Sequence, residues 1–293
     1  MKKAEKIAPQ VMRVTTGSSN AYILGNAQRW ILVDSGAPGN AKTILRAVSE
    51  YLGTNTTPAA ILLTHGHFDI SGSALELARR WSVRIHVHKL ELPFVNGTSC
   101  YPPVDPAVGG FLARLMRFAP NTKIDLSPHV RALTIQELPW MGGWRIIATP
   151  GHSPGHISLF RPSDRTLIAG DAITTINQDS AMAIFSRKPQ VLRPPAAFTC
   201  DWHAAAQSVQ RLAELNPQVL APAHGLPTSG EEALQQLKQL AENFPVPSYG
   251  RYVQEPARTD ENGITYLPPP VPDHAKRTAI LSATAAGAVA AGL

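Results

Sequence analysis

The residues of this sequence best suited to chemistry are histidines and aspartates that follow short apolar segments. Six of them stand in four separate loops: His65, His67, Asp69, His152, Asp171 and His224. Neutral imidazole nitrogens and carboxylate oxygens together are donors that bind Zn²⁺, iron or Mn²⁺ in proteins. A single loop histidine is more often structural, but this combination of donors predicts a metal site.

The pair His65 and His67 is the most informative part of the pattern. Side chains two residues apart, on an extended segment or on an irregular turn, can face the same ion. Gly66 lies between them and has no Cβ to obstruct the turn. Asp69 adds a carboxylate two residues further on. We therefore expect residues 64–69 to form the principal metal-binding loop.

Alternating strands and helices are predicted to carry these loops. Strands rich in β-branched and aromatic residues are expected at residues 11–15, 21–24, 30–33, 59–63, 83–87, 130–135, 144–148, 157–160, 166–169 and 219–220. Helical periodicity predicts helices over residues 41–52, 71–81, 202–215 and 230–242. Loops that follow neighbouring strands lie at the edge of a sheet, where α/β proteins place their binding sites. The distant candidate ligands can therefore meet in space.

The candidate ligands also carry a resemblance to a known family. Thr64-His65-Gly66-His67-Phe68-Asp69, followed in order by His152, Asp171 and His224, resembles the metallo-β-lactamase superfamily, as do the flanking segments Asn20-Ala21-Tyr22, Val33-Asp34-Ser35-Gly36 and Ala223-His224-Gly225. The resemblance extends over residues 10–243. It implies an α/β fold (α+β in some classifications), a four-layer αββα sandwich with two mixed β-sheets and outer helices.

The resemblance implies how the candidate ligands divide between two metal ions. His65, His67 and His152 would hold the first ion. Asp171 would bridge the two ions. Asp69 and His224 would belong to the second.

The chain departs from the superfamily pattern directly after Asp69. The pattern has a histidine there, whereas this chain has Ile70, which offers no donor atom. Three outcomes stay open: one ion on the three histidines, a second ion with water in the vacant position, or impaired catalysis. A missing ligand should weaken the second ion, because the residues that touch a metal dominate its binding.

The resemblance implies metal-dependent hydrolysis, with one or two Zn²⁺ ions and with iron or Mn²⁺ as other possibilities. The metal would activate water for attack on an ester, lactone, thioester or amide bond. Asp69, if it does not bind a second ion, would orient the nucleophile or move its proton. Two alternatives stay open: a mononuclear-iron oxidoreductase of the sulfur-dioxygenase type, and a non-catalytic binding protein with a degraded second site.

Residues outside the candidate ligand set are expected to shape and support the site. Asp34 is either a partner of the metal loop, because ligating histidines need hydrogen-bond partners, or a plain turn residue. Proline and glycine punctuate residues 90–128, which we interpret as an insertion near the site. Its apolar side chains are expected to wall the substrate or to pack on the body of the protein: Phe94, Tyr101, Phe111, Leu112, Leu115, Met116 and Phe118.

Composition and charge restrict the partners. The chain has 293 residues, of which 44% are hydrophobic and 16% charged, as in a globular protein. The net charge is +6, but the basic residues are scattered, so we expect a small-molecule substrate and no nucleic acid. The absence of an 18-residue apolar run or an apolar leader predicts a cytoplasmic protein without a membrane span. We expect one domain over residues 1–244, and an extension over residues 245–293 that packs on it or mediates a homodimer.

Overall fold

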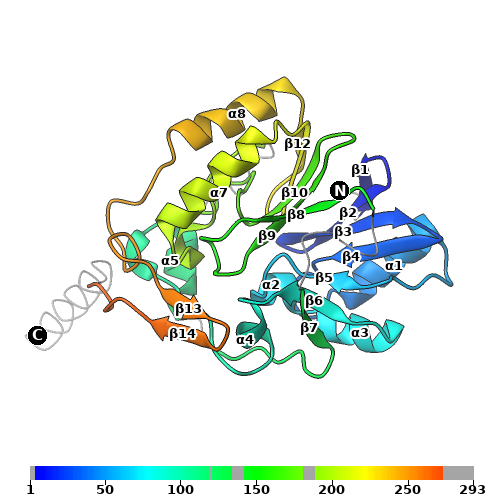
Figure 1. Cartoon of the computed structure of the whole chain (residues 1–293), viewed down its shortest axis with the longest axis horizontal. Coiled ribbons are helices and arrows are strands. Elements are labelled where there is room, and N and C mark those ends of the chain that lie inside the picture. Colours follow the sequence, from blue (N-terminus) through cyan, green and yellow to red (C-terminus); the bar gives the residue numbers. More distant parts are fainter. Residues whose placement is uncertain (1–3, 119–120, 134–141, 181–188, 273–293) are drawn as a thin grey trace, which may run out of the picture.

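The computed structural model describes residues 4–118, 121–133, 142–180 and 189–272, and every structural statement below refers to those ranges. The first half of the chain forms a mixed seven-stranded sheet (Figure 1). Its strands lie in sequence order: β1 (Ala4–Ala8), β2 (Val11–Thr16), β3 (Ser19–Asn26), β4 (Arg29–Val33), β5 (Ile61–Leu62), β6 (Ile85–His88) and β7 (Val130–Leu133). Strands β1 to β4 pair antiparallel, and β4 to β7 pair parallel. The parallel half therefore directs the loops after β4, β5 and β6 to one edge.

The second half of the chain forms a five-stranded sheet in the order β12-β11-β10-β9-β8. Its strands are β8 (Arg145–Ala148), β9 (Ile157–Arg161), β10 (Thr166–Gly170), β11 (Val219–Pro222) and β12 (Thr228–Ser229). Helix α7 (Trp202–Glu214) connects the parallel pair β10 and β11, and helix α8 (Glu231–Glu242) follows β12.

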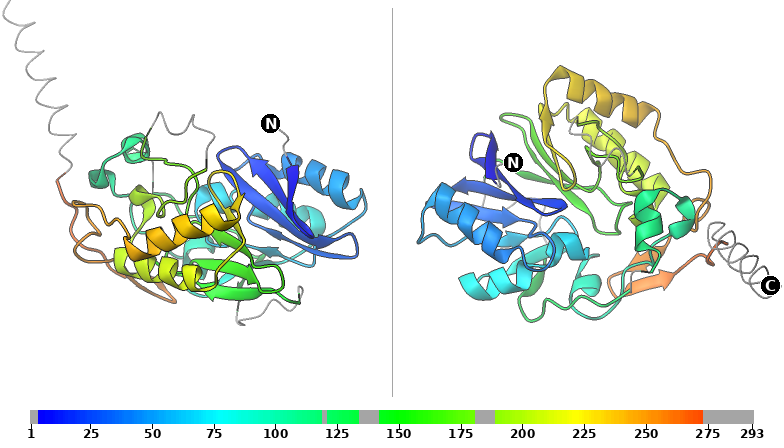
Figure 2. Two further views of the ribbon diagram at one scale, coloured as in Figure 1. Left: turned by 90° about the horizontal axis from the view of Figure 1, so that it is seen from above. Right: turned by 180° about the vertical axis from the view of Figure 1, so that it is seen from behind.

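Successive side chains along a strand face opposite sides of the sheet, so each sheet packs against helices on one face and against the other sheet on the other face. In β3, Ala21 and Ile23 pack in a core shared with helices α1 (Ala41–Leu52) and α3 (Ala74–Trp81), whereas Tyr22 and Leu24 face the other sheet. A third core joins the outer face of the second sheet to α7 and α8. The two views of Figure 2 show helices on the outer side of each sheet. The predicted αββα sandwich is confirmed.

The helix expected over residues 71–81 is found as α3, but it begins three residues later than predicted, at Ala74. Gly72 and Ser73 separate it from a short preceding helix, α2 (Phe68–Ser71). A Cβ on Gly72 would lie 2.3 Å from the side chain of Pro38, and the Ser73 hydroxyl donates to the carbonyl of Ala37 at 2.8 Å. This segment therefore packs against the turn after β4, a long-range contact that periodicity does not reveal.

The insertion contains short elements, among them a helix that the apolar spacing of residues 111–118 predicts. The segment from residue 90 to 128 includes α4 (Leu92–Val95), the 3₁₀ helix η1 (Pro106–Val108) and α5 (Phe111–Met116), and a second 3₁₀ helix, η2 (Ala196–Phe198), precedes α7. Beyond α8, strands β13 (Arg258–Asp260) and β14 (Gly263–Tyr266) form a hairpin. Tyr252 packs against Trp202 of the body.

The apolar tail after residue 272 lies outside the described residues. Within the described ranges, no helix is long and apolar enough to cross a membrane.

Candidate metal centre

Five of the six predicted site residues lie in loops that follow strands of the two sheets, and Asp69 lies in the first turn of α2. His65 and His67 lie between β5 and α2, and the loop containing His152 follows β8. Asp171 follows β10 directly, and His224 comes two residues after β11. The structure thus brings together donors that the sequence separates.

One oxygen of Asp171 lies at the centre of the cluster. Its Oδ2 is 3.5 Å from Nε2 of His65, 3.5 Å from Nε2 of His152 and 3.4 Å from Nε2 of His224. His67 completes the group, because its Nδ1 lies 3.0 Å from Nε2 of His152. Two ligands of a tetrahedral zinc, each about 2.1 Å from the ion, stand roughly 3.4 Å apart. The observed spacings match those of atoms that share an ion.

Two buried polar atoms of the cluster, Nε2 of His65 and Oδ1 of Asp171, lack hydrogen bonds among the described residues. Buried polar atoms without partners are rare in folded proteins, and each calls for an explanation such as an ion. The donor atoms of His65, His67 and His152 also lie within 4.8 Å of one another. The residues present therefore fit a divalent cation.

Asp69 and His224 form the other side of the centre. Oδ2 of Asp69 lies 3.1 Å from Nε2 of His224. The opposite ring nitrogen, Nδ1, lies 3.0 Å from the carbonyl oxygen of Ser18, to which it can donate a proton. That hydrogen bond orients the ring so that Nε2 faces both carboxylates.

Burial and neighbouring charges set the protonation of these groups. Burial lowers the pKa of His67 to about 4 and lowers the pKa of His65 and of His152 well below the usual value, so these rings are neutral at pH 7. Burial would also lower the pKa of His224, but the charges of Asp171 and Asp69 raise it well above the usual value. Neutral imidazole keeps the lone pair that a metal ligand requires.

Asp34 occupies the supporting position considered from the sequence. Its Oδ1 accepts a hydrogen bond of 2.8 Å from the Thr64 backbone N–H, and the Thr64 hydroxyl lies 3.2 Å from Nδ1 of His65. Thr64 therefore links this carboxyl to the first candidate ligand. Burial raises the pKa of Asp34 to about 8.

Two glycines permit the close packing of these loops. Gly170 has φ +56°, and a Cβ there would lie 2.5 Å from Nε2 of His156, which accepts a hydrogen bond from the Asp171 backbone N–H at 2.9 Å. At Gly66, a Cβ would lie 2.1 Å from a methyl group of Val95. Gly66 is thus required by a neighbouring side chain and not by a left-handed backbone.

Glu91 is a buried residue that the sequence analysis missed. Its Oε1 accepts hydrogen bonds from the Ser153 hydroxyl at 2.8 Å and from the Gly155 N–H at 2.6 Å. Its Oε2 accepts from the Gly66 N–H at 3.2 Å and from the Tyr101 hydroxyl. One carboxylate therefore joins the loop of His65 and His67 to the loop of His152. A glutamate at the start of a short helix in a proline-rich stretch carries no local signal of this role.

Ile70 is fully buried, and its backbone contacts the turn after β4. Its carbonyl oxygen accepts hydrogen bonds from the N–H of Ser35 at 2.7 Å and from the Ser35 hydroxyl at 2.8 Å. Its side chain brings no donor atom to the centre. Asp69, Asp171 and His224 are thus the protein donors on this side.

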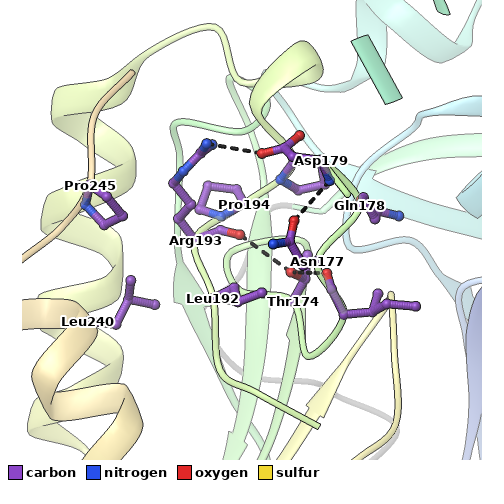
Figure 3. Close-up of a pocket in the computed structure, with 11 residues that line it drawn as sticks. Thr174, Asn177, Gln178, Asp179, Leu192, Arg193, Pro194, Leu240 and Pro245 are labelled. Carbon is purple, nitrogen blue, oxygen red and sulfur yellow. Dashed lines mark hydrogen bonds and ion pairs between the residues drawn. The ribbon is translucent and has the colours of Figure 1, made fainter. Parts of the chain in front are cut away.

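Two cavities differ in their relation to the metal centre. The larger, of about 520 Å³, has His67 in its wall together with residues of the insertion. The smaller, of about 160 Å³, lies between the segment after β10 and helix α8 (Figure 3). Arg193 and Asp179 form a 3.1 Å ion pair there, and none of the six candidate ligands lines it. The larger cavity is therefore the one that adjoins the metal centre.

Known proteins share both sequence and fold with this chain. The family model described as the metallo-beta-lactamase superfamily matches residues 14–224. The probable metallo-hydrolase YflN of Bacillus subtilis is 38% identical over 225 residues, or 75% of this chain and 85% of the relative. The hydroxyacylglutathione hydrolase of Erwinia tasmaniensis is 30% identical over 145 residues, or 50% of this chain and 43% of the relative. The crystal structure of BLEG-1 B3 metallo-beta-lactamase covers 81% of this chain and 99% of its own, at 21% identity with a TM-score of 0.56, which shows a similar fold.

Proposed function

The chain belongs to the metallo-beta-lactamase superfamily, and on that premise we propose that it is a metal-dependent hydrolase of an ester, lactone, thioester or amide bond. The observation that carries the proposal is the position of Asp171 Oδ2 within 3.5 Å of imidazole nitrogens from three separate loops. A buried carboxylate on which imidazoles from three loops converge, two of them held neutral by burial, has little structural purpose without a cation between them.

We assign His65, His67 and His152 to one ion, Asp171 to a bridging position, and Asp69 and His224 to the second side. We propose Zn²⁺ as the ion, because three imidazoles with a carboxylate suit it, although the same donors accept iron or Mn²⁺. When bound, such an ion supplies Lewis acidity that acidifies water and polarises a substrate oxygen.

The protonation states of the histidines and of Asp69 suit metal binding and proton transfer. Burial keeps the three imidazoles neutral, so no proton has to leave them before a cation binds. Burial would raise the pKa of Asp69, but the hydrogen bond and charge of His224 hold it below the usual value. Asp69 is therefore an ionised carboxylate at neutral pH. It is our candidate to orient the attacking water or to accept its proton.

Ile70, which supplies no donor atom, should limit how tightly the second side of the metal centre binds an ion. With Asp69, Asp171 and His224 as its only protein donors among the described residues, that side should bind an ion more weakly than the three histidines do. Hydrolysis needs only one ion in principle, because a single cation can both acidify water and polarise a carbonyl.

The missing donor at Ile70 also favours one alternative activity. A single iron held by histidines and a carboxylate, with open positions for oxygen and substrate, is the arrangement of non-haem iron oxygenases. Iron as the ion copurified with the protein, with oxygen uptake on addition of a persulfide, would support this oxidoreductase in place of the hydrolase.

The proposal is tested by elemental analysis and by hydrolysis of a panel of esters, lactones, thioesters and amides. Wild type should bind metal and turn over at least one class, whereas His65→Ala and Asp171→Asn should lose both properties. His203→Ala is the matched control, because His203 is exposed on α7. Metal binding that survives in both site variants would refute the assignment. Bound metal without turnover of any class would favour a binding protein.

A further inference from the structure

The cavity beside the metal centre has walls that are mostly apolar. Its volume is about 520 Å³, within the size range of small-molecule sites. Phe68, Tyr101, Met116 and Phe198 line it together with prolines of the insertion. Phe68, which directly follows His67, is 48% exposed. Of the seven insertion residues considered as a substrate wall from the sequence, Tyr101 and Met116 line this cavity, whereas Phe94, Phe111, Leu112, Leu115 and Phe118 do not.

Aromatic rings join this cavity to the candidate ligand His67. The ring centre of Tyr101 lies 4.5 Å from that of His67, and the ring centre of Phe198 lies 5.4 Å from it. A group bound against these rings would therefore touch the face of a side chain that is assigned to the metal. Substrate bound here would have its reacting bond within reach of the centre.

Tyr101 is a rigid part of the wall. Its ring stacks on Phe94 with centres 4.6 Å apart, and its hydroxyl is held by the carboxylate of Glu91. The same hydroxyl accepts a 2.8 Å hydrogen bond from the Gly66 N–H, between the first two candidate ligands. Ring stacking and hydrogen bonds thus fix the position of this wall relative to the metal loop.

The charge of the cavity restricts what it can accept. Arg117 is the one formally charged side chain among its described lining residues. No lining carboxylate is present among those residues to pair with a cation. A positively charged substrate would therefore lose hydration without gaining a counter-ion.

We infer that this cavity binds an uncharged, apolar acyl or aryl group of the substrate, and that Tyr101 and Phe198 determine its position relative to His67. The inference rests on the proposed hydrolytic function and names the substrate class for it. It excludes quaternary ammonium substrates, and it assigns specificity to the insertion and η2 instead of the metal-binding loops.

A series of aryl esters with straight acyl chains tests the inference. In wild type, kcat/KM should rise from the acetyl to the hexanoyl ester by up to about fourfold for each methylene that becomes fully buried. A trimethylammonium-ethyl ester should react more slowly than its uncharged dimethylbutyl counterpart of the same shape. A flat chain-length series, or a preference for the cationic ester, would overturn the inference even if hydrolysis is confirmed.

Helix α5 offers a matched pair of variants. Met116 lines the cavity, whereas Leu115 is 64% exposed and does not line it. Met116→Trp should therefore fill the cavity and lower kcat/KM for the hexanoyl ester at least tenfold relative to the acetyl ester, while Leu115→Trp should leave this ratio unchanged. Phe198→Ala should enlarge the cavity and shift the preference toward longer or bulkier acyl groups.

A binding measurement separates this inference from the proposed function. The uncharged fluorescent probe Nile red should bind folded wild type, and Met116→Trp but not Leu115→Trp should weaken its binding at least fivefold. If no ester is hydrolysed but this binding pattern holds, hydrolysis is refuted and the apolar site is supported. If the two tryptophan variants bind the probe equally and show the same chain-length profile, the apolar site is refuted.

Discussion

Replacing Glu91 by alanine should damage both the fold and the metal centre, although Glu91 is not a candidate ligand. The side chain is fully buried, and its two oxygens receive hydrogen bonds from Ser153, Gly155, Gly66 and Tyr101. Ser153 directly follows one candidate ligand, and Gly66 lies between two others. The carboxylate therefore holds the two histidine loops in register.

The magnitude follows from the groups that alanine would leave without partners. The Gly155 N–H loses its hydrogen bond, and the hydroxyls of Ser153 and Tyr101 must turn to other acceptors, while Gly66 retains the Tyr101 oxygen. An unpaired buried donor costs about 1–3 kcal/mol, so with the cavity left behind we expect Glu91→Ala to lower the free energy of unfolding by about 3–5 kcal/mol. Looser ligand loops should reduce metal affinity roughly 10- to 100-fold.

Glutamine at the same position should be much milder and should reveal the charge of Glu91. It keeps the shape and one acceptor oxygen, so we expect a loss below about 2 kcal/mol near neutral pH. Burial raises the pKa of Glu91, so the folded state takes up a proton more readily than the unfolded chain. Wild-type stability from this group is therefore present at acid pH and is lost as pH rises through the raised pKa. Glu91→Gln has no such loss, so its deficit should shrink with rising pH.

Urea denaturation of metal-free protein across this pH range, with metal affinity from competition against a chelating dye, measures both effects. Glu242→Ala, at the exposed end of α8, is the control for removal of a carboxylate. The reasoning fails if Glu91→Ala matches this control in stability and in metal affinity. If the stability deficit of Glu91→Gln relative to wild type grows as pH rises, the argument from the raised pKa of Glu91 is refuted.

Three further variants test separate parts of the centre. Ile70→His should raise the amount of metal per chain in elemental analysis, and a wild type that already holds two tight ions would contradict our account of Ile70. Burial raises the pKa of Asp34 to about 8, so the stability that this group contributes is present near pH 4, the free-chain pKa of aspartate, and is lost as pH rises to about 8. Urea denaturation of metal-free protein should therefore show the stability of Asp34→Asn rising relative to that of wild type across this pH range. Gly170→Ala should lower the unfolding free energy by about 2–4 kcal/mol, because φ is +56° and the added Cβ meets His156. Gly39→Ala is its control: φ there is +88° with nothing within 4 Å, so calorimetry should show a smaller loss.

The sequence alone was sufficient for features set by local periodicity and residue type. The spacing of apolar residues predicted α1 with the bounds Ala41–Leu52 that the structure shows, because its buried face repeats every three to four residues. It also identified His65, His67, Asp69, His152, Asp171 and His224 as candidate ligands, since each follows a strand and carries a donor that metals prefer. The structure brings these six together, and their roles as ligands await the experiments above.

Tertiary structure decided the features that depend on which distant segments meet. The break between α2 and α3 arises from contacts with the turn around Pro38, and Gly66 is required by Val95. The supporting role of Glu91 depends on partners up to 64 positions away in the chain. Strands such as β1, β13 and β14 carry weak apolar alternation, and their pairing partners define them. A periodic pattern reports only that a face is buried, whereas the packing of two sheets determines what that face contacts.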